Sequence, residues 1–311
     1  MSRAPEVTFD LATRVGSVAL ANPVMTAAGT AGHGAELGAF VDLAALGALV
    51  VKSLSADPWP GNPPPRVTPV AAGILNSVGL QGPGLPAWRS GELPELLARG
   101  ARVVVSIWGR TVAEFARAAA LVADLPEAVV AVEVNVSCPN LEARDAIFAA
   151  SPEATAAVLE ATSGCGRPRW AKLSPGVANL VEVAGAALGA GAEALTLVNT
   201  LPAMRIDLER RAPVLGGRGG GLSGAALHPV AVRAVWDVRA ALGPVPIVGV
   251  GGVATGEDAV ELLLAGAHAV QVGTAHLADP RASLAVLAGI EAFCARHGVA
   301  AVRDLVGAAH G

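Results

Sequence analysis

Lysine is scarce in this chain of 311 residues: Lys52 and Lys172 are the only lysines among its 22 basic residues, and the rest are arginines. Each lysine ends a short apolar run, LGALVVKS or RWAKLS, at a place where a charge is costly. A lysine ammonium is compact and sits on a flexible stem, whereas an arginine guanidinium is wide and planar. The two lysines therefore indicate an anion or a polar ring bound inside a barrel mouth.

Long apolar runs, cysteine pairs and basic stripes are missing too. No stretch of about 18 uninterrupted apolar residues could span a bilayer. The three cysteines form no CxxC pair, which argues against a disulfide framework and a zinc site. The net charge of −4 and the lack of a basic stripe argue against nucleic acid as a partner. The N-terminal residues show no export signal, so we expect a cytoplasmic protein that does not contact a membrane.

Metal-binding patterns are also missing from the sequence. The six histidines form no HxH or HExxH spacing, and the acidic residues form no clear cluster at a strand end. A metal-dependent hydrolase is therefore disfavoured. A Schiff-base aldolase stays open on this evidence, because a desolvated lysine can act as its nucleophile.

Short β-rich apolar runs alternate with amphipathic helical patterns along the chain. The candidate strands are 24–29, 48–53, 103–109, 132–139, 169–174, 194–200, 246–252 and 269–275, and the candidate helices are 34–46, 111–124, 152–163, 178–190, 228–242, 256–266 and 281–297. Eight such units predict one closed (β/α)8 TIM barrel spanning residues 1–311. The alternative, an open doubly wound sheet, lacks its acidic residue about 20 positions after the first turn.

Three segments depart from this alternation. Segments 54–100 and 201–227 are rich in Pro and Gly and each follows a strand, so we expect both to form long loops over the C-terminal mouth of the barrel. Residues 7–20 contain a turn-like VGS between two alternating runs. We expect them to form a hairpin that plugs the other end.

The last two strand ends, VGVGGVATGED and VQVGTAHLAD, carry the strongest local signal. Adjacent glycines let a ligand approach the backbone, and Thr255 with Asp258 resembles a capping box that opens a helix. Together with Gly273 and Thr274, this pattern matches the phosphate site of many barrels. The alternative is that the glycines only turn the chain.

A lone cysteine and several amides end other strands. Cys138 in NVSCPN is a candidate base or nucleophile, whereas a buried structural cysteine is the usual alternative. Asn76, Ser106, Asn135 and Asn199 with Thr200 also end strands or loops. Any one of them alone would be a turn residue. Together at one mouth they offer paired donors and acceptors to a planar, amide-rich ligand.

In combination and in order, these segments resemble the class 1 dihydroorotate dehydrogenases, which are FMN-dependent (β/α)8 barrels of pyrimidine synthesis. The resemblance covers essentially the whole chain. Its motifs are VKS at Lys52, GNPPPR (61–66), GILNSVGLQGPGL (73–85), NVSCPN (135–140), KLSPGV (172–177), LVNTL (197–201), MRIDL (204–208), GGLSG (220–224), VGVGGV (248–253) and VGTA (272–275). GNPPPR, GGLSG and GGV are most similar to the catalytic subunit of the NAD-linked class 1B.

The resemblance implies that Cys138 removes a proton from C5 of dihydroorotate while a hydride passes from C6 to N5 of FMN. Such a base should have a thiol poised near neutral pH and sheltered from water. Lys52 would lie near both flavin and substrate. Lys172 would reach the flavin's N1 and C2 carbonyl region, where positive charge stabilises the anionic reduced ring.

The family also implies two sets of binding residues. The substrate set is Lys52, Asn76, Ser77, Val78, Gly79, Leu80, Asn135, Asn199 and Thr200. The FMN set is Ala28, Gly29, Lys52, Ser53, Ser106, Asn135, Lys172, Val198, Ser223, Gly224, Gly251, Gly252, Gly273 and Thr274.

The chain departs from the family pattern at three places. Ala28 stands where the family often has Ser, and Ser106 stands where the NAD-linked class usually has Asn, so each position can cost one hydrogen bond. After NVSCPN, Arg144 and Asp145 occupy positions that are commonly Gly-Gly. This change bears on how the catalytic lid closes.

The route by which electrons leave is open. NAD reduction needs a partner subunit with FAD and a [2Fe–2S] centre, because this chain has no cysteine cluster and no second dinucleotide motif. The resemblance implies a homodimer or a heterotetramer with that subunit. The alternatives are a fumarate-using class 1A enzyme, another FMN pyrimidine dehydrogenase, and a phosphate-binding barrel without redox chemistry.

Overall fold

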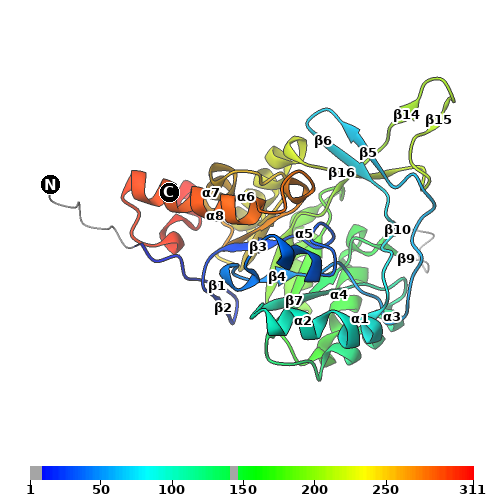
Figure 1. Ribbon diagram of the computed structural model, residues 1–311, viewed down its shortest axis with the longest axis horizontal. Helices are drawn as coiled ribbons and strands as arrows, with labels where there is room; N and C mark the ends of the chain where they lie inside the picture. The colour runs from blue at the N-terminus through cyan, green and yellow to red at the C-terminus, as the bar shows by residue number, and fades with distance from the viewer. Residues whose placement is uncertain (1–8, 141–145) are drawn as a thin grey trace.

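The computed structural model describes residues 9–140 and 146–311, and at its centre eight parallel strands form a closed barrel (Figure 1). The strands are β3 (Val24–Thr26), β4 (Leu49–Val50), β7 (Val103–Ile107), β8 (Val129–Asn135), β11 (Arg169–Leu173), β12 (Ala194–Leu197), β17 (Ile247–Val250) and β18 (Ala269–Val272). Neighbours in the chain are neighbours in the sheet, and a parallel bridge between Met25 and Ala48 closes the ring. All eight predicted strands are confirmed, each within its predicted run or nearly so.

Six of the predicted helices are also confirmed. They are α3 (Val112–Val122), α4 (Pro152–Ala161), α5 (Leu180–Gly189), α6 (His228–Leu242), α7 (Gly256–Ala265) and α8 (Ala282–His297). Local chemistry explains where several begin: Thr111, Ser151 and Asn179 each accept a hydrogen bond from the backbone of the first turn. In the residues that the structure describes, no helix has the length and apolar character needed to cross a membrane.

The helical assignment at 34–46 was wrong. This segment forms two short 3-10 turns, η1 (Ala35–Ala39) and η2 (Leu43–Ala45). The side chain of Asp42 accepts a hydrogen bond from the backbone of Ala44 and so starts a second turn instead of continuing one helix. The helix pair α1 (Leu85–Gly91) and α2 (Leu93–Ala98) lies instead inside 54–100, where proline and glycine concealed it.

An apolar hairpin covers the N-terminal end of the barrel, as predicted. Strands β1 (Thr13–Val15) and β2 (Val18–Leu20) pair antiparallel around Gly16. Their buried side chains, Val15, Val18 and Leu20, pack with Met25, Trp170 and other inward residues of the barrel strands. This end of the barrel is therefore filled, which leaves the opposite end for a site.

The two long segments meet over the C-terminal mouth (Figure 1). They form one antiparallel sheet in the order β13 (Leu201–Ala203), β16 (Gly220–Ser223), β6 (Gly73–Asn76), β5 (Val67–Val70). The hairpin of β14 (Ile206–Asp207) and β15 (Ala212–Pro213) extends beyond this sheet, and β9 (Pro139–Asn140) pairs with β10 (Ala146–Ile147) beside it. Further 3-10 turns are η4 (Phe148–Ala150), η5 (Ser163–Cys165), η6 (Ala225–Leu227), η7 (Thr274–Leu277), η8 (Val302–Leu305) and η9 (Ala308–His310).

Candidate active site

A cavity of about 660 Å³ lies between the C-terminal ends of the barrel strands and the sheet above them. Nearly all of the predicted site residues line it, although they come from every part of the chain. These are Ala28, Gly29, Lys52, Ser53, Asn76, Ser77, Val78, Gly79, Leu80, Asn135, Cys138, Lys172, Val198, Asn199, Thr200, Ser223, Gly251, Gly252, Gly273 and Thr274.

Two predicted residues lie behind the cavity wall. The Ser106 hydroxyl is fully buried and bonds to the Ser53 hydroxyl at 2.8 Å, so it supports Ser53. Gly224 has a φ of 96°, and a Cβ there would lie 2.7 Å from Gly73 Cα. Gly224 thus lies where two backbone segments pass so close together that a side chain would not fit.

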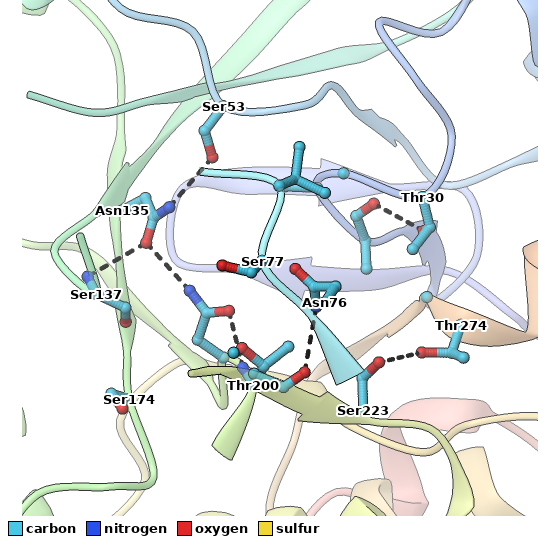
Figure 2. A pocket seen from close by; sticks show the side chains of 18 of the residues that line it. Thr30, Ser53, Asn76, Ser77, Asn135, Ser137, Ser174, Thr200, Ser223 and Thr274 are labelled. Atoms are coloured by element: carbon cyan, nitrogen blue, oxygen red, sulfur yellow. Dashed lines mark hydrogen bonds between the residues drawn. The ribbon is translucent and has the colours of Figure 1, made fainter. Parts of the chain in front are cut away.

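A row of hydrogen-bonded amides and hydroxyls crosses the strand ends (Figure 2). Asn135 Nδ2 donates to Ser53 Oγ at 3.2 Å, and Asn199 Nδ2 donates to Asn135 Oδ1 at 3.2 Å. Asn199 Oδ1 in turn accepts from the backbone of Thr200 at 2.8 Å. These bonds determine which face of each amide is a donor and which is an acceptor. A planar ligand with alternating N–H and C=O groups suits such a wall.

Asn76 is held separately on the sheet above the row. Its Nδ2 donates to the carbonyl of Gly221 on the neighbouring strand β16 at 3.3 Å. Asn62 Nδ2 donates to the hydroxyl of Ser77 at 2.9 Å and so fixes the next residue along. The cavity therefore has amides on two opposite sides, one carried by the barrel and one by the sheet.

Cys138 follows strand β8, and its side chain is buried. Its Sγ donates to the carbonyls of Gly109 at 3.1 Å and Asn135 at 3.2 Å. Burial raises the pKa of this thiol to about 12, and the nearby carboxylate of Glu114 acts in the same direction. The thiol is sheltered from water as predicted, but the structure does not hold its pKa near neutral, because desolvation outweighs the backbone hydrogen bonds at Gly109 and Cys138 that lower the pKa.

Lys52 and Lys172 both line the cavity. The ammonium of Lys52 donates to the backbone carbonyl of Gln81, and burial, together with the charge of Arg66, lowers its pKa. Lys172 is 4% exposed and pairs with Glu133 at 3.2 Å inside the barrel. The sequence interpretation missed Glu133. The available signal was a carboxylate in the middle of the apolar strand VEVNV.

The loops after β17 and β18 form a site suited to an anion. Gly251 and Gly252 have φ values of 140° and 71°, and a Cβ on Gly252 would lie 2.5 Å from His228 Cβ. The predicted capping box of Thr255 and Asp258 is present at the start of α7. Next to it, Thr274 Oγ1 donates to Ser223 Oγ at 2.8 Å (Figure 2). Gly251, Gly252, Ser223, Gly273 and Thr274 all line the cavity at these loops, so glycine backbone and two hydroxyls border the space that an anion would occupy.

Other wall residues were missed by the sequence interpretation, including Thr30, Asn62, Ser137, Ser174, Pro202, Gly219, Gly220, Gly221 and Leu277. Ser174 ends a predicted strand and Asn62 lies in GNPPPR, so both carried a signal of position. Gly221 lies in the GGLSG motif, but its role depends on a contact with Thr200 that no local pattern reveals, because a Cβ on Gly221 would lie 1.9 Å from Thr200 Oγ1. Arg144 and Asp145 lie outside the described residues.

Comparison with known proteins identifies the family of this chain. The sequence profile of the family described as dihydroorotate dehydrogenase matches residues 10–293. A relative from Desulforudis audaxviator is 50% identical over 96% of this chain and 97% of its own length, and one from Geotalea uraniireducens is 44% identical over 96% and 98%. Both are named dihydroorotate dehydrogenase B (NAD(+)), catalytic subunit. The chain therefore belongs to the dihydroorotate dehydrogenase family.

Proposed function

We propose that this chain oxidises dihydroorotate to orotate in pyrimidine synthesis, with bound FMN as the hydride acceptor. The observation that carries the proposal is one cavity that joins a sheltered cysteine, a row of oriented amides, two lysines and an anion-binding pair of loops. Relatives with 43% to 50% identity that bear the name of an NAD-linked catalytic subunit support the class 1B assignment.

The residues present fit FMN. The cavity is within the range of about 300–1,000 Å³ that is usual for cofactor sites. Gly29 lines it with a φ of 102°, and a Cβ there would meet no protein atom within 4 Å, so this wall is open to a flat ring. The phosphate would lie at the loops after β17 and β18. When bound, FMN supplies a two-electron acceptor at N5.

Apart from Lys52 and Asn135, which also belong to the substrate set, each residue of the proposed FMN set has a defined part. Ala28, Gly29, Ser53 and Val198 would border the ring, and Lys172 would face its pyrimidine edge. Ser223, Gly251, Gly252, Gly273 and Thr274 would hold the phosphate and its linker. Ser106 and Gly224 would act from behind the wall, through Ser53 and Gly73.

Cys138 would act as the base of the reaction. Its thiolate takes the C5 proton of dihydroorotate while the C6 hydrogen leaves with its electron pair, so a C5=C6 double bond forms and two electrons leave the ring. The buried position excludes water, which makes the thiolate a strong base once it has formed. The same burial keeps most of the thiol protonated at neutral pH.

The amides and Lys52 would orient the substrate. Asn76 and Asn135 approach the cavity from the sheet and the barrel, and Asn199 with Thr200 extends the row. The Lys52 ammonium would pair with the carboxylate or with a ring carbonyl, while Ser77, Val78, Gly79 and Leu80 would cover the ring. Uracil-type ligands lack the carboxylate and so would lose this ion pair.

The whole assembly follows from the same proposal. Residues 1–311 would form a single FMN-binding domain, present in a homodimer or in a heterotetramer with a subunit that carries FAD and a [2Fe–2S] centre. A cytoplasmic location stays a prediction of the sequence.

The decisive experiment is anaerobic reduction of the purified, FMN-loaded chain. We expect a yellow protein whose flavin absorbance bleaches on addition of dihydroorotate and does not bleach with dihydrouracil, because dihydrouracil has no carboxylate. A chain that takes up no FMN would overturn the proposal. Equal bleaching by dihydrouracil would indicate a different pyrimidine dehydrogenase.

A further inference from the structure

Three polar side chains form a closed triangle inside the barrel, directly behind the cavity. Lys172 Nζ donates to Glu133 Oε1 at 3.2 Å and to Gln271 Oε1 at 3.5 Å. Gln271 Nε2 donates to the other carboxylate oxygen, Glu133 Oε2, at 2.8 Å. Glu133 and Gln271 are fully buried.

The triangle joins opposite sides of the barrel. Glu133 lies on β8 and Gln271 on β18, and β17, β12 and β11 separate these two strands in the sheet order. Lys172 stands on β11 between them and is the only member that lines the cavity. A ligand in the cavity would therefore lie next to the Lys172 ammonium, with the Glu133 carboxylate behind that ammonium.

One N–H donor of the Lys172 ammonium has no acceptor among the three residues of the triangle. An ammonium has three N–H donors, and two of them serve Glu133 and Gln271. Both carboxylate oxygens already accept a bond within the triangle. The third Lys172 donor is therefore available to a group in the cavity, and its direction is fixed by the other two bonds.

Stability alone does not account for this arrangement. Burying an ion pair costs desolvation energy that well-packed apolar residues of similar volume would avoid. The interior around the triangle shows that such residues are available, since Val104, Ala131 and Val248 fill the same barrel below it. A charged network kept at this depth thus has a role in the site.

We propose that Glu133 is a positioning and charge-balancing residue for Lys172, and that it thereby sets the reduction potential of the bound flavin. The inference rests on the proposed FMN function. Reduction places negative charge at the N1 and C2 carbonyl edge of the ring, which Lys172 stabilises. The Glu133 carboxylate offsets part of the positive charge of Lys172. The reduction potential of the flavin is therefore lower than it would be beside an unpaired lysine.

The test uses three variants of the FMN-loaded chain that keep the volume of the triangle. Glu133→Gln removes the carboxylate, Gln271→Glu adds a second one, and the double variant Glu133→Gln/Gln271→Glu moves the carboxylate from β8 to β18. The double variant keeps the charge and can keep all three hydrogen bonds with donor and acceptor exchanged. It is therefore the matched control for packing.

Two readouts report the charge at the ring without turnover. The midpoint potential measures reduction directly, and sulfite addition at N5 places negative charge on the same N1 and C2 edge. We expect Glu133→Gln to bind sulfite about tenfold more tightly and to raise the potential by roughly 30 mV, the equivalent of tenfold for a two-electron couple. Gln271→Glu should shift both in the opposite direction, and the double variant should return close to the parent.

The outcomes separate this inference from the proposed function. If the parent chain takes up no FMN, the proposed function fails first. If the parent binds FMN and is reduced by dihydroorotate, but the potential and sulfite affinity are the same in all variants, only the inference about Glu133 is overturned. Should Glu133→Gln fail to fold, the comparison of Gln271→Glu with the double variant still tests the inference, because these two differ by one carboxylate charge. Equal midpoint potentials and equal sulfite affinities in the two would overturn it.

Discussion

At the scale of single residues, the site depends on burial more than on unusual side chains. Cys138 and Lys172 are ordinary residues placed where they are almost fully buried. Burial makes the thiol hard to ionise and the thiolate reactive, and it gives the ammonium a strong effect on any nearby charge. The chemistry of both therefore depends on what the surrounding strands place within a few ångströms.

Cys138 yields a prediction about pH. The base form is the thiolate, and burial raises the pKa of the thiol to about 12, so at neutral pH only a small fraction is deprotonated. That fraction grows by about tenfold for each pH unit below the pKa. We expect the rate of flavin reduction by dihydroorotate, measured by stopped flow, to rise steadily with pH. A rate independent of pH would contradict this view.

Two serine variants make the test specific to Cys138. Cys138→Ser should keep FMN but reduce it more slowly by about two orders of magnitude at each pH, because a hydroxyl is a weaker acid still. Cys165→Ser is the matched control, since that thiol is also buried but lies in η5, away from the cavity wall. Equal rates in the two variants would remove Cys138 from the role of base.

At the scale of elements, the sheet over the mouth forms one wall of the site. Strand β16 lies between β13 and β6, so Gly221 faces Asn76 on one side and Pro202 on the other. The close approach of Gly221 to Thr200 brings the sheet down onto the amide row. The position of the substrate residues thus depends on strand packing that has no room for a side chain.

Gly221→Ala tests this dependence. The added Cβ would lie 1.9 Å from Thr200 Oγ1, so the sheet must shift, at a cost of about 1–3 kcal/mol. We expect a lower melting temperature and weaker orotate binding, measured by the change in flavin absorbance. Gly185→Ala is the control, because Gly185 lies in α5 away from the cavity wall and its Cβ would meet no neighbouring atom within 4 Å. Equal orotate affinities in the two variants would show that Gly221 does not position the site.

At the scale of the whole molecule, local patterns predicted the barrel and its mouth but not the contacts across it. Each strand is a short β-rich run between helices, so its place in the barrel follows from order alone. The interaction of Glu133 with Gln271 joins residues 138 positions apart, and no local pattern signals it. The orientation of side chains was equally hidden: Ser106 lies one residue before the end of β7, yet its hydroxyl bonds to Ser53 behind the cavity wall.

The route of electrons out of the molecule gives the last prediction. The three cysteines are buried on separate elements, at the end of β8, in η5 and in α8, so they do not gather to hold an iron–sulfur cluster. We expect the isolated FMN-loaded chain to be reduced once by dihydroorotate and then to turn over with an artificial dye, but to reduce neither NAD+ nor fumarate. Rapid turnover with fumarate would favour a class 1A enzyme. NAD+ reduction by the chain alone would show that no second subunit is needed, since hydride would then pass directly between the two cofactors.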